Sequence, residues 1–348
     1  QPRIDFTGGG CGSLLLEPSR TNLITQSEYF GGYTNSNSTD EANATTSPEG
    51  LINATSFLEA ATTGQHKLFT SVIFDGSSNY TFSVFAKSNG RDLYVDTQNS
   101  NEWGGKAWFD LTAGTANAIL GTADIEDFGN GWYRCTVTGA STLSGGNFVE
   151  LLTSDGSTNS TIGDITKGVY IYGAQVEQGS YPTSLIPTYG TSVTRAADVC
   201  IDAGNSSTFN SEEGVLFFDG LFFESIIGNF ISLSNGLTGT GSVSFRTDST
   251  NRYKFFVGSY NYLTPFNEYD VTERHKIALV WSLTSFKVFI DGVKKHDVSI
   301  SFTPSASFSR LNLSNYQGTG KIVNGKAKQV LTFNTALSDA ECIELTTI

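Results

Sequence analysis

The chain lacks methionine altogether and is poor in residues on which common enzyme chemistries depend. Only three of its 348 residues are histidine, and charged residues make up only 16%. Serine and cysteine nucleophiles need a histidine base, and none of His66, His275 and His296 accompanies a nucleophile motif. We therefore interpret all three histidines as structural.

Basic residues are also scarce, with 21 Lys and Arg against 34 Asp and Glu, a formal net charge of −13. Nucleic-acid binding needs clustered lysine and arginine to displace counterions, and no such cluster is present. The same scarcity argues against an anionic membrane surface as a partner. No run of about 18 apolar residues occurs, so we expect no membrane insertion. A glycine-rich phosphate loop is missing too, which argues against nucleotide use.

The four cysteines show no CxxC spacing, which argues against a zinc site. Cys200 opens the second half of the chain and Cys342 nearly closes it. A disulfide between these two and four free thiols both remain open at this point. Because the chain starts at Gln1 and has no methionine, we expect a cleaved or truncated product whose targeting segment is not in view.

What the chain does contain is glycine (37), phenylalanine (25), tyrosine (14) and many small polar residues. Short alternating segments separated by glycine-containing turns predict an all-β protein made of sandwiches. The expected strands of the first half are 55–58, 66–73, 80–86, 93–97, 106–111, 131–138, 147–152 and 168–176. Those of the second half are 214–224, 229–233, 241–246, 254–257, 275–281, 286–290 and 326–333.

The two halves meet in residues 170–198, where a strand runs into a segment with Pro182 and Pro187. Proline cannot donate to a sheet ladder, so strand pairing should stop near Pro182. A length of 348 residues favours two domains. We expect an N-terminal domain over 1–182, a linker over 183–197 and a C-terminal domain over 198–348.

Two local signals stand out in the second half. Asp291-Gly292 between apolar segments predicts a β-hairpin. Near the end, residues 337–345 predict a helix, with Ser338 as N-cap and Glu341 three residues later completing a capping box.

Three motifs of the second half carry a family resemblance: HKIALVWS (275–282), FKVFIDGV (286–293) and GKAKQVLTFNTALSDAE (325–341). Together they resemble the laminin-G-like, or concanavalin A-like lectin/glucanase, sandwich. The resemblance covers about residues 198–348 and implies that fold.

The first half resembles a different module, on LLLEPSRTNLI (14–24), DFGNGWYRCTVT (127–138) and YIYGAQVEQGSYPTSLIPT (170–188). These motifs are similar to carbohydrate-binding-module-like jelly rolls of bacteriophage tail-fibre and other virion surface proteins. The tandem of both modules resembles marine phage proteins. The resemblance implies a role on a virion or outside the cell.

The glucanase pattern Glu-x-Asp-x-x-Glu, which places carboxylates on one strand face, is absent. Asp219 and Glu224 are five residues apart, so in a regular strand they face opposite sides. The alternatives Glu212-Glu213 and 124–127 fit no better, the latter resembling a solvated loop. We therefore expect no enzymatic activity.

Sugar binding by β-sandwiches uses aromatic rings stacked on sugar rings and polar side chains that bind hydroxyls. Trp103, in a Gly/Asn-rich loop, is the candidate in the first half. Trp108, Trp132 and Trp281 lie in alternating strand patterns and are expected in the core.

In the second half, Tyr260, Asn261, Tyr262 and Tyr269 crowd one connection and form a second candidate glycan-binding group. An inter-subunit contact fits the same residues equally, because exposed tyrosine is also common in protein interfaces.

Calcium is the candidate inorganic cofactor, since it prefers carboxylate and carbonyl oxygens in loops. In the jelly rolls that the first half resembles, a structural metal often joins the first and last strands. This would bring Glu17 and Glu177 together as ligands. The alternative is that both are edge charges, or that Glu17 pairs with Arg20 or Arg195. Asp155 and Asp164 are a weaker second pair.

These observations lead to a functional hypothesis: a non-enzymatic virion surface or fibre protein that binds host-cell glycans. Its expected location is the virion surface or the extracellular space, with other virion proteins as partners and a homotrimer as the expected assembly. One alternative is a purely structural decoration or assembly protein. Another is a secreted protein that binds or degrades polysaccharide.

Overall fold

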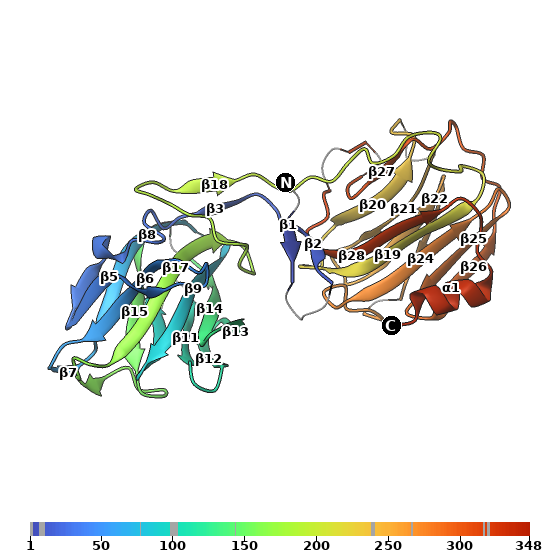
Figure 1. Cartoon of the computed structure of the whole chain (residues 1–348). Helices are drawn as coiled ribbons and strands as arrows, with labels where there is room; N and C mark the ends of the chain where they lie inside the picture. Colours follow the sequence, from blue (N-terminus) through green and yellow to red (C-terminus); the bar gives the residue numbers. More distant parts are fainter. Residues whose placement is uncertain are drawn as a thin grey trace. The chain divides into compact units, whose positions relative to one another are not determined.

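The chain folds into two separate compact units (Figure 1). The computed structural model describes residues 3–6, 11–76, 78–97, 104–142, 144–237, 241–265, 267–315, 317–318 and 321–348. Residues 19–196 form the N-terminal unit, and residues 1–18 join 197–348 in the C-terminal unit. Both units are β-sandwiches, which confirms the predicted fold class.

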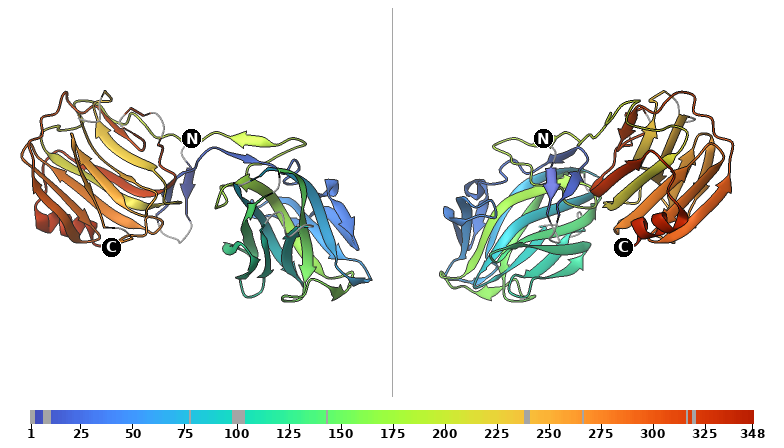
Figure 2. Two further views of the ribbon diagram at one scale, coloured as in Figure 1. Left: turned by 180° about the vertical axis from the view of Figure 1, so that it is seen from behind. Right: turned by 45° about the vertical axis from the view of Figure 1, so that its right-hand side comes forward.

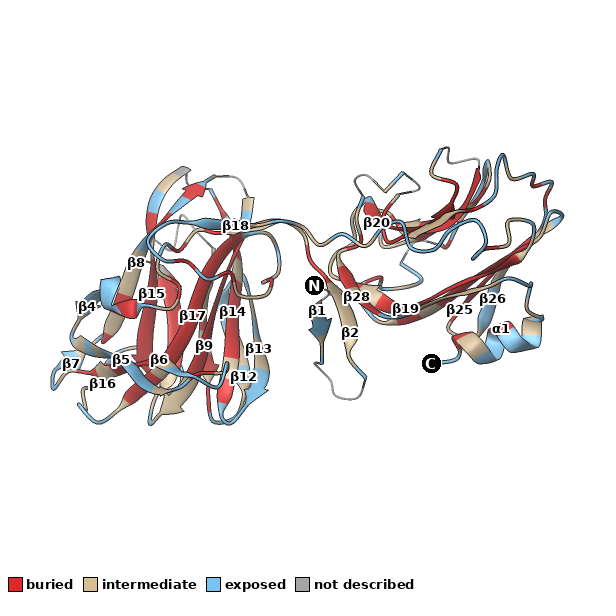
Figure 3. Cartoon of the chain, turned by 45° about the horizontal axis from the view of Figure 1, so that its top comes forward, coloured by how far each residue is buried: buried red, intermediate tan, exposed pale blue. Residues whose placement is uncertain are grey.

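In the N-terminal unit, two antiparallel sheets pack face to face. Sheet I consists, in spatial order, of β12 (Thr115–Leu120), β11 (Lys106–Asp110), β10 (Asp92–Thr97), β15 (Ser144–Ser154), β8 (Lys67–Asp75) and β4 (Thr34–Ser36). Sheet II consists of β13 (Thr122–Gly129), β14 (Trp132–Ser141), β9 (Ser78–Asn89), β17 (Gly168–Gln178), β6 (Ile52–Glu59) and β5 (Ser38–Thr46). Their inward apolar side chains, among them Phe57, Phe82, Phe109 and Leu151, form one buried core. Figure 3 colours long stretches of β9, β15 and β17 as buried.

Short elements complete this unit. They are the 3-10 turn η1 (Phe30–Gly32) and two small ladders, β7 (Thr63–Gly64) with β16 (Thr161–Ile162) and β3 (Arg20–Asn22) with β18 (Val193–Arg195).

The C-terminal unit is a second sandwich. Sheet III consists of β1 (Arg3–Asp5), β2 (Ser13–Leu16), β28 (Gly325–Phe333), β19 (Gly214–Phe222), β24 (His275–Trp281), β25 (Ser285–Ile290) and β26 (Val293–Ser299). Sheet IV consists of β23 (Tyr260–Leu263), β22 (Tyr253–Val257), β21 (Ser242–Thr247), β20 (Gly228–Ser234) and β27 (Arg310–Asn312). The core between them is rich in aromatic residues, including Phe218, Phe245 and Trp281.

The predicted hairpin lies between β25 and β26, which pair antiparallel. Asp291 (φ 50°) and Gly292 (φ 77°) both adopt positive φ, as a two-residue type I′ turn requires. The tight turn at these two positions is thus confirmed.

The predicted C-terminal helix is also present as α1 (Asp339–Thr346), which packs on the outer face of sheet III (Figure 2). Leu337, Cys342 and Leu345 make its apolar contact, whereas Ile343 is exposed. The Ser338 hydroxyl accepts from the backbone N–H of Glu341, and the Glu341 carboxylate accepts from that of Ser338, which completes the capping box.

Ser338→Ala should destabilise the C-terminal unit by about 1 kcal/mol, because it leaves a helix N–H without its acceptor. Urea unfolding of Ser338→Ala and Ser338→Asn measures this, since asparagine also caps helices. An equal loss of unfolding free energy in Ser338→Ala and Ser338→Asn would contradict a capping role.

The predicted start of the N-terminal domain at residue 1 is wrong. Residues 14–16 lie in β2, which pairs with β28 rather than with a strand of the jelly roll. Leu16 is buried in the core between sheets III and IV. The Leu14–Leu16 run is therefore apolar because it belongs to the C-terminal sandwich.

The predicted linker is likewise more ordered than a free connection. Pairing in β17 stops at Gln178, before Pro182, as predicted. The chain then stays with the N-terminal unit up to residue 196, and Thr183, Ile186 and Thr188 are buried there. We call residues 181–188 the strap, because they cover the outer face of sheet II.

All four cysteines are free thiols, so the disulfide alternative for Cys200 and Cys342 does not apply. Cys200 packs against the core between sheets III and IV, whereas Cys342 lies under α1. Within the described residues, no helix has the length and apolar character needed to cross a bilayer.

Candidate functional site

The outer face of sheet I carries an arrangement of aromatic and charged side chains that the sequence did not reveal. Along β11, Ala107 and Phe109 point into the core. Because successive strand residues face opposite sides, Lys106 and Trp108 point outward. Trp108 is partly exposed and belongs to no buried core cluster. The expectation that Trp108 is a core residue is therefore wrong.

Strand register places further outward residues beside Trp108. Tyr94 of β10 lies directly opposite Trp108, and Asp96 lies opposite Glu150 of β15. Phe69 of β8 follows in the same row, opposite Glu150. We call Lys67, Phe69, Tyr94, Asp96, Lys106, Trp108 and Glu150 the sheet I platform.

Two ion pairs organise the platform. Lys106 Nζ lies 2.6 Å from Asp96 Oδ2 and 5.6 Å from the centre of the Tyr94 ring. Lys67 Nζ lies 2.9 Å from Glu150 Oε1 and 5.5 Å from the centre of the Phe69 ring. Each lysine thus bridges a carboxylate and an aromatic ring.

The ionisation of these groups reflects their partial burial. Burial is the largest single effect and lowers the pKa of Lys106, but the hydrogen bonds and charge interactions with Asp96 and Tyr94 together outweigh burial and raise this pKa. Burial raises the pKa of Tyr94, against the opposing effect of Lys106. At neutral pH Lys106 therefore carries an ammonium group beside the neutral Tyr94 ring.

Unused hydrogen-bonding capacity remains next to the rings. Asn117 of β12 lies opposite Trp108, and its buried Nδ2 has no hydrogen-bond partner among the described residues. Buried polar groups without partners are uncommon in folded proteins. On this face Trp108 is partly exposed, whereas Tyr94, Asp96 and Glu150 are largely buried beside it. An indole ring with paired charges and an amide next to it forms a set suited to binding hydroxyl-rich ligands.

Trp103, the candidate from the sequence, lies outside the described residues. In the sequence it stands between β10 and β11, the two strands that supply Tyr94, Asp96, Lys106 and Trp108 to the platform. Its glycan-binding role stays a prediction.

The other two tryptophans are buried, as expected. Trp281 lies in the core between sheets III and IV. Trp132 packs with Phe85 and Tyr172 in a small cluster on the outer face of sheet II, and its Nε1–H donates to the Thr46 carbonyl at 3.0 Å.

The second candidate group divides between two faces of sheet IV. Tyr262 stacks on Phe286, with ring centres 5.6 Å apart. Both Tyr262 and Tyr269 pack against the core of the C-terminal unit. Asn261 is exposed on the opposite face, and Tyr260 is exposed at the end of β23. The structure therefore does not gather Tyr260, Asn261, Tyr262 and Tyr269 into one surface, and their role in binding stays a prediction.

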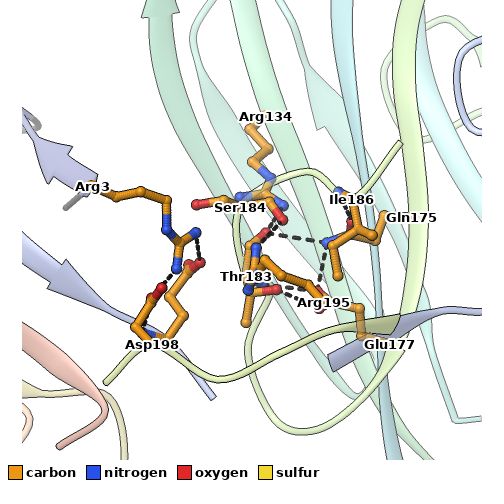
Figure 4. Close-up of polar contacts among 10 residues, drawn as sticks. Arg3, Arg134, Gln175, Glu177, Thr183, Ser184, Ile186, Arg195 and Asp198 are labelled. Carbon is orange, nitrogen blue, oxygen red and sulfur yellow. Dashed lines mark hydrogen bonds and ion pairs between the residues drawn. The ribbon is translucent and has the colours of Figure 1, made fainter. Parts of the chain in front are cut away.

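The proposed calcium ligands belong to different units, because Glu17 lies in the C-terminal unit. The premise that Glu17 and Glu177 belong to one jelly roll is therefore wrong. Glu17 forms an ion pair with Arg3. Arg3 also contacts Asp198 (Figure 4). Among the described residues, no group of three or more His, Cys, Asp or Glu side chains could hold a metal ion.

Glu177 is fully buried and holds the strap (Figure 4). Its carboxylate accepts from the backbone N–H of Thr183 at 2.8 Å, from the Thr183 hydroxyl and from Gln175 Nε2 at 2.6 Å. Arg134 donates to the Thr183 carbonyl at 2.5 Å, and Ile186 N–H donates to Gln175 Oε1 at 2.6 Å. These contacts give Glu177 a structural role.

The residues considered for catalysis have structural partners too. Asp219 is buried and receives two hydrogen bonds from Arg274, at 2.6 and 2.7 Å. His66 is buried, with Nδ1 2.6 Å from the Asn37 carbonyl oxygen. His296 packs on Tyr262, and His275 Nδ1 lies 2.6 Å from Asp291 Oδ2.

No protein-family model matches the chain, and no curated protein matches it. Solved structures resemble it in fold only. The CBM40 domain of the Ruminococcus gnavus IT-sialidase bound to α2,3-sialyllactose is 13% identical, with a TM-score of 0.34 over 42% of this chain and 94% of that one. The native heptameric SAP-like pentraxin from Limulus polyphemus is 14% identical, with a TM-score of 0.30 over 38% of this chain and 69% of that chain.

Domains LG4-5 of the mouse laminin α1 chain are 12% identical, with a TM-score of 0.27 over 80% of this chain and 89% of that chain. Such weak likenesses carry no argument about what this chain binds.

Proposed function

We propose that the chain is a non-enzymatic glycan-binding protein and that the sheet I platform is its binding surface. The observation that carries the proposal is the pairing of Trp108 with Tyr94 on the outward face, flanked by the Lys106–Asp96 ion pair. Aromatic rings stack on the apolar faces of sugars, and charged and amide groups exchange hydrogen bonds with sugar hydroxyls.

The expected mode of binding follows from the platform geometry. A sugar ring lies against the partly exposed Trp108 indole, and its hydroxyls bind the Lys106 ammonium group beside Asp96. The next sugar along the row of strands meets Glu150 and Lys67. The ion pairs hold these polar groups in place before binding, which lowers the entropic cost of association.

Trp108→Ala should weaken glycan binding by roughly thirtyfold, since truncating a central aromatic contact costs about 2 kcal/mol or more. A glycan array identifies the bound sugars, and titration calorimetry with one of them measures the loss. Trp103→Ala tests the loop residue in the same assay.

Phe128→Ala is the matched control, because Phe128 is an exposed aromatic residue on sheet II of the same unit. It should bind like the parent. A blank array from folded protein, or equal loss in Trp108→Ala and Phe128→Ala, would contradict the proposal. Repeating the array with a chelator tests the predicted calcium dependence.

We also propose that this binding serves attachment to a host cell, with the chain on a virion surface or outside the cell. The support is the motif resemblance of 14–24, 127–138 and 170–188 to phage fibre modules. A homotrimer is the expected assembly, and sedimentation velocity measures it.

A further inference from the structure

The outer face of sheet IV carries two cations, Arg246 and Lys254, for which the described residues supply no counter-ion. Along β21 and β22, the side chains that pack in the core are those of Val243, Phe245, Tyr253 and Phe255. The alternate residues, among them Ser244 and Arg246 on β21 and Lys254 and Phe256 on β22, therefore point to the opposite face.

Arg246 and Lys254 stand directly opposite each other in the β21–β22 ladder. Both also lie over the same ring: Arg246 Cζ is 5.8 Å and Lys254 Nζ is 5.4 Å from the centre of Phe256. Phe230 stacks on Phe256 at 6.0 Å with an angle of 17° between the rings. Like charges opposite each other destabilise a sheet, and the contacts of both cations with the Phe256 ring offset part of that cost.

Neighbouring carboxylates do not neutralise the pair. Asp248, in the turn after β21, pairs with Arg252 at 2.7 Å. Within the described part of the chain, neither Arg246 nor Lys254 forms an ion pair. Elsewhere in this acidic protein, most of the described lysines and arginines contact a carboxylate or a carbonyl oxygen.

Two donors beside the pair are also unused. Arg246 Nη1 and Ser244 Oγ are buried and have no hydrogen-bond partner among the described residues. Ser244 is only 1% exposed and lies opposite Phe256. The partly exposed guanidinium and ammonium groups form a site with two positive charges, above a buried layer that still has unused donors.

We propose that this face of β21 and β22 is an anion-binding site for an acidic polysaccharide, distinct from the sheet I platform. The Arg246 guanidinium and the Lys254 ammonium, both partly exposed, bind one carboxylate or sulfate group. Arginine binds planar or tetrahedral oxyanions through paired hydrogen bonds. The bound anion removes the repulsion between the two cations.

A polymer suits the surface better than a small anion. The cations lie on a sheet face, next to the exposed Asn261 of β23, which stands opposite Phe256. An extended chain can contact both positions along the row of strands, whereas a single small ion contacts only the cations.

The test measures binding of chondroitin sulfate, polygalacturonate and neutral dextran to the full chain by titration calorimetry. At least one acidic polymer should bind, and its binding should weaken as the salt concentration rises. Any binding of dextran should be the same with and without Arg246 and Lys254. Arg246→Gln and Lys254→Gln should each weaken acidic-polymer binding roughly tenfold or more, since hydrogen bonds to charged groups contribute at least that factor. Polygalacturonate binding shows that a carboxylate is sufficient, and binding of chondroitin sulfate without polygalacturonate binding shows that a sulfated chain is needed.

Lys328→Gln is the charge-matched control, because Lys328 is exposed on β28 of sheet III. It should bind like the parent, and thermal melting should show all three variants folded. No binding of either acidic polymer, or equal loss in Lys328→Gln, overturns the proposal. Trp108→Ala should keep this binding, so failure here and failure of the sheet I platform are distinguishable.

Discussion

Arg91→Ala should destabilise the N-terminal unit by about 3–5 kcal/mol, the cost of removing one partner of a buried ion pair. Glu59 is 1% exposed, and its carboxylate lies 2.9 Å from Arg91 Nε. Thr153 and Thr161 hydroxyls donate to the same carboxylate at 2.9 and 2.8 Å, and Asp164 N–H does so at 2.9 Å. Without Arg91 the carboxylate keeps these three donors but loses its counter-charge.

The loss should depend on pH. Burial alone would raise the pKa of Glu59, but the bonds to Arg91, Asp164, Thr161 and Thr153 outweigh burial and lower it below 4.5. A lowered carboxyl pKa gives stability that is present above 4.5 and is lost as pH falls through the folded-state value. The difference between parent and Arg91→Ala should therefore be large at pH 7 and shrink in acid.

Urea unfolding at pH 7 and pH 4 measures both effects. Lys294→Ala is the control, since Lys294 pairs at the surface with Asp297 and Asp339, and surface pairs contribute only about 0–1 kcal/mol. If Arg91→Ala costs no more than Lys294→Ala, or the same amount at both pH values, the Glu59–Arg91 pair does not hold this unit together.

The sequence predicted those features of the fold that depend only on residues close together in the chain. The Asp291-Gly292 turn and the Ser338 capping box need only neighbouring residues, and both are present. The partner of the Leu14–Leu16 run could not be predicted, because β28 lies some three hundred residues further on. Alternation shows that a strand has an apolar face, but it does not show which sandwich that face enters.

The same limit explains why Trp108 was missed. In KAWFD (106–110), Trp108 and Phe109 are adjacent, so one faces the core and the other faces outward. The sequence offers no reason to choose tryptophan as the outward residue. The position of Tyr94 beside it also depends on the register of β10 with β11, which the intervening loop does not specify.

The C-terminal unit should lose stability as pH rises from 5.5 to 8, because His275 is held as an imidazolium. Its Nδ1 lies 2.6 Å from Asp291 Oδ2 and its Nε2 lies 2.8 Å from the Asp270 carbonyl oxygen. Both contacts need a ring N–H donor, and only the protonated ring has two.

The direction of the effect follows from the pKa. Burial alone would lower the pKa of His275, but the bonds to Asp291 and Asp270 outweigh burial and raise this pKa above 6.5. A raised histidine pKa gives stability that is complete below 6.5 and is lost as pH rises through the folded-state value. Each unit by which the pKa is raised corresponds to about 1.4 kcal/mol.

His275→Gln isolates this contribution, because glutamine can donate at one end but carries no titrating charge. The variant should unfold at lower urea concentration than the parent at pH 5.5, with the gap closing towards pH 8. His296 cannot produce the same trend, since burial lowers its pKa and its contribution changes with pH in the opposite sense. A parent protein whose stability is equal at pH 5.5 and 8, or a His275→Gln variant with the parent's pH slope, would show that His275 is neutral in the folded state.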